Sequence, residues 1–168
     1  MNTQQRLFSR YISELRPGTL QWIGLRPAHK TDMRLTDHVN ALKGLGLEGD
    51  HRCSKTPGSA RQVTLISTEY IQQIAHFSGI PNIKPATLRR NLVVSGINLN
   101  AMRYQQFTIG DALFEATALC HPCARIERAL GRGAVAAMLG HGGLCCKILI
   151  SGTIKIGDAV IPVMPHNL

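Results

Sequence analysis

The sequence predicts a mainly β fold of the α+β class, namely a β-barrel with helical insertions. Short runs rich in β-branched residues alternate with Gly-rich corners, and only a few segments show helical periodicity. An internal echo is the second observation, because Phe107-Thr-Ile-Gly-Asp-Ala-Leu-Phe resembles Ile154-Lys-Ile-Gly-Asp-Ala-Val-Ile. A Gly-Asp between apolar residues suits a tight turn or bulge at the rim of a barrel. Two copies in different surroundings do not indicate a repeat protein.

In the first half of the chain, two helices flank a β-rich stretch. Apolar residues at helical spacing predict a helix over 3–15, which Pro17-Gly18 ends. Strands are expected at 19–25 and 62–67, with a loop or ragged strand over 26–37. Ser67 or Thr68 then caps a helix that runs through Phe77 and stops at Gly79 and Pro81.

The second half alternates short strands with short helices. We expect a helical turn at 85–89, strands at 91–95, within 107–119, at 144–151 and at 154–163, helices at 123–130 and 134–139, and a break at Gly140-His141-Gly142-Gly143. Pro162 and Pro165 indicate an edge position for the last strand, or its exit from the sheet.

Composition predicts one globular domain, 1–168, with a core over about 19–165 and an N-terminal helical extension over 1–18. The net charge of +9 indicates an anionic partner such as nucleic acid, a membrane surface or a phosphate-bearing small molecule, or else a well-solvated surface. Scattered aromatic residues argue against nucleic acid, and the absence of a long apolar run argues against a membrane. The simplest location is a reducing cytoplasm, in which the five cysteines are free or metal-bound thiols.

The stretch Cys120-His121-Pro122-Cys123 is the main candidate for chemistry, at the switch from a strand to a helix. Its CxxC spacing is compatible with a redox pair or with a zinc site completed by Cys145, Cys146, His121 or His141. Cys120, Cys145 and Cys146 are individually typical of buried packing residues. Cys123 is different, because a thiol at a helix start is favoured as the thiolate.

Two basic segments are further candidates for binding. Residues 44–52 carry three glycines followed by His51 and Arg52, which are compatible with a bent loop or with anion contacts. Arg89-Arg90-Asn91 leads into a strand, where the arginines are suited equally to phosphate or carboxylate and to a solvated helix end. Arg125 and Arg128 are predicted to form a surface face.

Taken in order, these segments resemble the MOSC domain, named after the C-terminal part of molybdenum cofactor sulfurase. The resemblance covers about Gly46 to Val163 and rests on these short motifs: Gly49-Asp50-His51, Arg61-Gln62-Val63, Arg90-Asn91-Leu92-Val93-Val94-Ser95-Gly96, Ile109-Gly110-Asp111, His121-Pro122-Cys123, Gly142-Gly143-Leu144 and Ile156-Gly157-Asp158. It implies a MOSC-type β-barrel with peripheral helices, related to the pyruvate kinase β-barrel domain.

The resemblance also implies a function. Cys123 matches the family cysteine that coordinates molybdenum in the amidoxime-reducing members, and His51, Arg61, Arg90 and Asn91 would line the pterin cofactor or its substrate. The expected activity is then a molybdenum-cofactor oxidoreductase that reduces N-hydroxylated compounds, with electrons from a partner reductase. One alternative is a sulfur carrier that holds a persulfide on Cys123, supplied by a cysteine desulfurase. Another alternative is a non-catalytic module that binds the cofactor. The cofactor implied in each of the binding roles is molybdopterin with molybdenum, and the protein can be purified with or without it. Cys120 is expected to be a packing residue, or at most a thiol that supports the ligand from behind.

Overall fold

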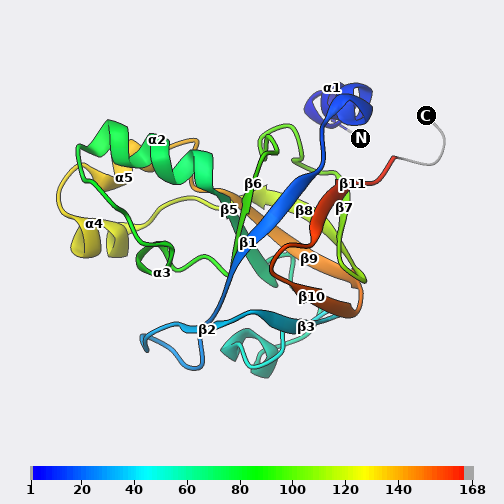
Figure 1. Cartoon of the computed structure of the whole chain (residues 1–168), viewed down its shortest axis with the longest axis horizontal. Helices are drawn as coiled ribbons and strands as arrows, with labels where there is room; N and C mark the ends of the chain where they lie inside the picture. The colour runs from blue at the N-terminus through cyan, green and yellow to red at the C-terminus, as the bar shows by residue number, and fades with distance from the viewer. Residues whose placement is uncertain (1, 165–168) are drawn as a thin grey trace.

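A computed structural model describes residues 2–164 and shows a closed β-barrel (Figure 1). Its strands are β1 (Gly18–Leu25), β5 (Val63–Ser67), β6 (Leu92–Ser95), β7 (Gln106–Ile109), β8 (Ala112–Leu119), β9 (Leu144–Ile150) and β11 (Ala159–Pro162). They pair in the order β11-β7-β8-β9-β5-β6-β1, and β11 also pairs with β1, which closes the barrel. Only β5 and β6 run parallel, so the barrel is mixed. The predicted fold class is confirmed.

A smaller sheet of β10 (Gly152–Lys155), β3 (His38–Leu42) and β4 (Gly46–Leu47) lies beside the barrel, and β2 (Arg34–Thr36) extends β1. The prediction of one last strand over 154–163 is wrong. Gly157, at φ 95°, turns the chain between β10 in the small sheet and β11 in the barrel. The predicted edge position is confirmed only at Pro162 itself. Strand β11 pairs with β1 through Val160 and no further, so Pro162 has a neighbouring strand, β7, on one side alone. Pro165, and with it the end of the predicted core, lies outside the described residues.

The helices are α1 (Thr3–Tyr11) with the 3-10 turn η1 (Ile12–Glu14), η2 (His51–Ser54), α2 (Thr68–Ser78), α3 (Pro85–Leu88), α4 (Ala124–Leu130) and α5 (Ala134–Met138). The Ser67 hydroxyl accepts a hydrogen bond from the Tyr70 amide at 3.1 Å, and Gly79 ends α2 in the left-handed region. The predicted cap and stop of this helix are therefore confirmed. Figure 1 shows α2, α3, α4 and α5 gathered on one side of the barrel, with α1 at a different end. No helix within residues 2–164 has the length and apolar character needed to cross a membrane.

The apolar side chains of the strands fill the barrel. Phe107 and Phe114, on neighbouring strands, stack with ring centroids 5.4 Å apart and are fully buried. Burial of each such side chain contributes about 1.5–3 kcal/mol. This packed interior makes the strand ends rigid, and the loop that follows β8 carries the predicted cysteine motif.

Candidate functional site

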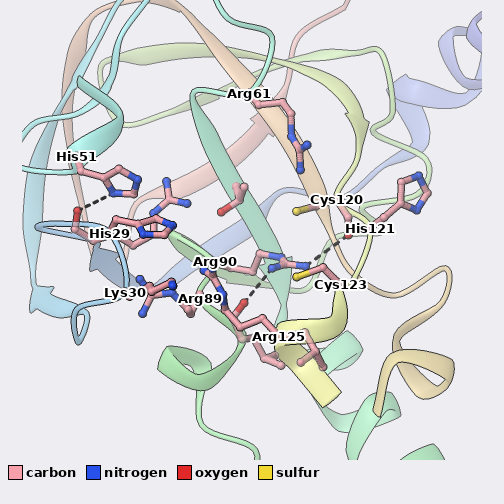
Figure 2. Close-up of a pocket in the computed structure, with 14 residues that line it drawn as sticks. His29, Lys30, His51, Arg61, Arg89, Arg90, Cys120, His121, Cys123 and Arg125 are labelled. Atoms are coloured by element: carbon pink, nitrogen blue, oxygen red, sulfur yellow. Dashed lines mark hydrogen bonds between the residues drawn. The ribbon is translucent and has the colours of Figure 1, made fainter. Parts of the chain in front are cut away.

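A cavity of about 270 Å³ opens where β8 ends and α4 begins. The chain reaches it from four separated regions, which contribute Arg26 and His29, His51 and Arg61, Arg89 and Arg90, and Cys120, Cys123 and Arg125. Figure 2 shows the sulfur atoms of Cys120 and Cys123 on one side of this cavity and the imidazole of His51 pointing in from the other. The structure thus brings together four of the five predicted site residues, namely Cys123, His51, Arg61 and Arg90.

Cys123 is the exposed thiol of the site. It is the N-cap residue of α4, with extended backbone angles, and its carbonyl accepts a hydrogen bond from the Ile126 amide at 2.8 Å. Its predicted place at a helix start is confirmed. Because Cys123 both lines the cavity and reaches solvent, its sulfur is open to a ligand that enters from outside.

Cys120 is not a simple packing residue, although it is buried. The neighbouring Cys145 thiol lowers the pKa of Cys120; burial opposes this effect, and the charges of Arg90 and Arg61 lower the pKa further. The pKa of Cys145 rises in turn, because Cys145 keeps the shared proton and is itself buried. Of the two thiols, Cys120 is therefore the one whose ionisation the surroundings favour. Within residues 2–164, no three His, Cys, Asp or Glu side chains lie close enough together to hold a metal ion, so the residues proposed for a zinc site do not form one.

Arg90 is a buried cation held by carbonyl groups. Only 8% of the residue is exposed. Its guanidinium donates to the Gly142 and Leu88 carbonyl oxygens at 2.9 Å each, and to the Cys120 carbonyl oxygen at 3.4 Å. None of the ion pairs among residues 2–164 includes it. A buried charge without a counter-ion is costly, so the position favours an anion in the cavity.

Asn91 lies behind the cavity rather than in its lining. Its side-chain nitrogen donates to the Gly24 carbonyl oxygen at 3.1 Å and to Asp50 Oδ2 at 2.9 Å, while its oxygen accepts from Thr64. With 1% of its surface exposed and its donors already used, Asn91 acts as a positioning residue. It joins the strands that carry Arg90 and Arg26.

Asp50 is the centre of this frame. Its carboxylate accepts from the Arg26 guanidinium at 3.0 and 3.1 Å, from the Arg26 and Arg52 amides at 2.9 Å each, and from Asn91. Burial alone would raise the pKa of Asp50, but the hydrogen bonds and charge of Arg26 outweigh it and the pKa lies below its ordinary value. The frame fixes Arg26 at the cavity wall. Sequence reasoning missed it, although Gly49-Asp50-His51 was already among the noted motifs.

His51 and Arg61 complete the walls. His51 Nδ1 lies 3.1 Å from the Arg26 carbonyl oxygen and must donate to it, which leaves Nε2 for the cavity. Arg61 lies beside the Cys120 and Cys145 thiols. The peptide bond before Arg61 is fixed by a hydrogen bond of 2.6 Å from the Thr117 hydroxyl to the Ala60 carbonyl oxygen.

The lining is positively charged as a whole. Lys30, Arg61, Arg89, Arg90 and Arg125 line the cavity without any acidic side chain among the lining residues. Arg125, predicted to lie on a surface face, is in fact part of this wall. The arrangement can therefore hold a polyanionic ligand next to two thiols.

The barrel belongs to a known class of domain. The family model of the MOSC domain matches residues 49–161, more than half of the chain, and the protein belongs to this family.

Solved structures show the same fold. The YuaD protein of Bacillus subtilis superposes with a TM-score of 0.76 at 20% identity, over 87% of this chain and 95% of YuaD. YiiM from Geobacillus stearothermophilus gives 0.69 at 15% identity, over 88% of this chain and 75% of YiiM. YiiM from Escherichia coli gives 0.66 at 18% identity, over 89% and 72%. No curated protein sequence matches significantly. At these identities the likeness establishes the fold alone.

Proposed function

We propose that this MOSC protein binds a molybdenum cofactor and reduces N-hydroxylated compounds, with Cys123 as the molybdenum ligand. The observation that supports it best is the combination, in one cavity, of an accessible thiol and a set of cations without acidic partners. Thiolates are soft ligands that suit a molybdenum centre. The cations suit the phosphate of the pterin.

The residues present fit the cofactor. Arg90 and Arg61 present guanidinium groups next to the thiols, where anionic groups of the cofactor would lie. His51 Nε2 adds a hydrogen-bonding group on the opposite wall (Figure 2). The cavity of about 270 Å³ is close to the lower end of ligand pockets, which span roughly 300–1,000 Å³, and it opens outward.

When bound, the cofactor supplies the two-electron chemistry, while the protein supplies binding and orientation. Conversion of R–NHOH into R–NH2 and water takes up two electrons and two protons. His51 is placed to pass a proton through Nε2, since Nδ1 is fixed on the Arg26 carbonyl. Electrons would come from a partner reductase, because the chain shows no dinucleotide-binding fingerprint.

Metal and pterin analysis tests the proposal. Protein from a host that makes the cofactor is expected to contain molybdenum and pterin in proportion to protein, and Cys123→Ser to lose the molybdenum. Cys53→Ala is the matched control, because Cys53 lies outside the cavity, with its thiol on the Leu47 carbonyl. Absence of molybdenum and pterin from the wild-type protein would overturn the proposal. Cofactor binding without reduction of any hydroxylamine, with any electron donor, would leave a cofactor-binding module.

The Cys120 thiolate favours a second candidate, a sulfur carrier. Its charge, next to Cys123 in one cavity, is suited to receiving or releasing sulfane sulfur. Cys123 Sγ would attack the outer sulfur of a desulfurase persulfide, the S–S bond of that persulfide would break, and the desulfurase would leave as a thiolate, which takes the proton lost by Cys123. Mass spectrometry after incubation with a cysteine desulfurase would then show a gain of about 32 Da on Cys123, one step on the cysteine ladder. An unmodified Cys123 would exclude this role.

A further inference from the structure

A second hollow, of about 490 Å³, adjoins the cavity on its outer side. It is lined by Lys30, Arg89, Arg125 and Arg128. The first three also line the inner cavity, so the two spaces share a wall, whereas Arg128 belongs to the outer hollow alone. Arg125 and Arg128 are three residues apart on α4 and therefore lie on one face of the helix.

The cations of this hollow repel one another. Burial lowers the pKa of Arg89, and the charges of Arg125 and Arg26 lower it further. Asp32 and Asp50 act in the opposite direction but more weakly, and Asp50 is already paired with Arg26. Within residues 2–164, Lys30, Arg89, Arg125 and Arg128 take part in no ion pair. The hollow therefore carries several positive charges that no acidic side chain among the described residues pairs with.

Two of these cations are held in unusual backbone conformations. Lys30 has φ 63° and Arg89 has φ 55°, in the left-handed region that residues with a Cβ seldom adopt. The Arg89 guanidinium donates to the Thr31 carbonyl oxygen at 2.7 Å, which fastens the two segments together at the rim. Arg89 is thereby kept facing the hollow.

We infer that the outer hollow is the subsite for a phosphate group carried by the substrate, so that the preferred substrates are N-hydroxylated compounds bearing a phosphate. This inference rests on the proposed function. The thiols, Arg61 and Arg90 line the inner cavity only, which assigns the cofactor to that space. Cys123 lies two residues before Arg125, so a substrate whose N–O group meets the metal at Cys123 would extend its other end into the hollow. A concave arginine site also suits a compact phosphate better than the broad surface of a protein partner.

The test compares an aryl hydroxylamine with its para-phosphonate derivative on cofactor-loaded protein. The wild type is expected to prefer the phosphonate at least about tenfold in kcat/KM, as one well-placed ionic contact allows. Arg128→Ala should raise KM for the phosphonate several-fold and leave the neutral compound unchanged, and Arg128→Glu should abolish the preference. Arg132→Ala is the matched control, since it removes the same charge from an exposed arginine outside the hollow. Equal kcat/KM for both compounds in the wild type would overturn the inference.

Two further measurements separate this inference from the proposal beneath it. If Arg128→Ala loses molybdenum and pterin, the hollow holds the cofactor phosphate and the substrate subsite is refuted. If neither compound is reduced, the reductase role fails, and titration with phenylphosphonate decides the subsite alone. Binding that Arg128→Glu abolishes and Arg132→Ala preserves supports an anion subsite, whereas binding unaffected by both excludes it.

Discussion

Replacement of Asp50 by Asn tests whether the frame behind the cavity depends on a buried charge. Oδ2 accepts three hydrogen bonds, from the Arg26 amide, Arg26 Nε and Asn91, and Oδ1 accepts two, from Arg26 Nη2 and the Arg52 amide. Asn retains one oxygen and places an amino group at the other position. The better orientation places the amino group at the Oδ1 position, where it faces two donors, Arg26 Nη2 and the Arg52 amide. Arg26 also loses its counter-ion.

The cost follows from these contacts. Two hydrogen bonds to a charged acceptor at about 1.5–3 kcal/mol each give a loss of roughly 3–6 kcal/mol. Breaking a buried ion pair costs about 3–5 kcal/mol, which agrees. Urea unfolding of both proteins measures the difference. Glu115→Gln is the control, because its ion pair with Lys147 is about one-third exposed and should be worth less than about 1 kcal/mol.

The pH dependence has a definite sign. The folded-state pKa of Asp50 is below its ordinary value of 3.8, so its charge stabilises the fold above that value, and the benefit disappears as the pH falls through the folded-state pKa. The free-energy gap between the wild type and Asp50→Asn should therefore be constant near neutrality and narrow in acid. A gap below about 1 kcal/mol at neutral pH, similar to that of Glu115→Gln, would refute the reasoning.

Three other perturbations probe the site. Gly143→Ala should lower the free energy of unfolding in urea by about 3 kcal/mol or more, because the φ of Gly143 is 88° and a Cβ there would overlap the Leu65 carbonyl oxygen. Gly140→Ala, at φ 79° but with open space around it, should lower it by only about 1–2 kcal/mol. Equal losses for the two variants would contradict this reasoning. The rate of alkylation of Cys120, mapped by mass spectrometry, should change little between about pH 7 and 8, because its lowered pKa leaves it largely ionised there. Cys53, whose pKa burial raises, should react faster as the pH rises. A Cys120 rate that rises like that of Cys53 would count against a thiolate. Inorganic phosphate should raise the melting temperature of the cofactor-free wild-type protein, and it should raise that of Arg128→Glu by less. Equal rises in the two proteins would exclude phosphate binding at the outer hollow.

Local signals in the sequence predicted much of the barrel. The serine cap and glycine stop of α2, the turn at Ile109-Gly110-Asp111 and the helix start at Cys123 are each set by residues within a few positions of one another. The strand β3 was missed because it is short and contains polar residues, and β4 was missed because it has only two residues. The end of β10 was missed because a two-residue turn within an apolar run leaves the periodicity almost unchanged.

The site itself depended on contacts that no local pattern contains. Arg26 and Asp50 are 24 positions apart, and the Thr117 hydroxyl meets the Ala60 carbonyl across 57 positions. The charge of Cys120 arises only when the barrel brings Arg61, Arg90 and Cys145 around it. The residue types were visible in the sequence. Their roles, such as Asn91 as a positioning residue and Arg125 as a wall residue, required the closed barrel.

The electrostatics of the cavity connect the fold to its chemistry. A barrel of this size could satisfy Arg90 with a carboxylate, as it satisfies Arg26 with Asp50, yet it holds Arg90 on three carbonyl oxygens and gives it no carboxylate partner among the residues described. Such an arrangement lowers the stability of the empty protein and raises the affinity for an anion, because the binding energy is realised only when the ligand arrives. The Cys145 thiol and the same positive field lower the pKa of Cys120, so the cavity favours a thiolate next to guanidinium groups. A ligand that satisfies both must offer a thiophilic centre and anionic groups within one molecule. A phosphorylated metal–pterin cofactor, as proposed above, would meet this requirement, whereas a simple dithiol or an anion alone would not.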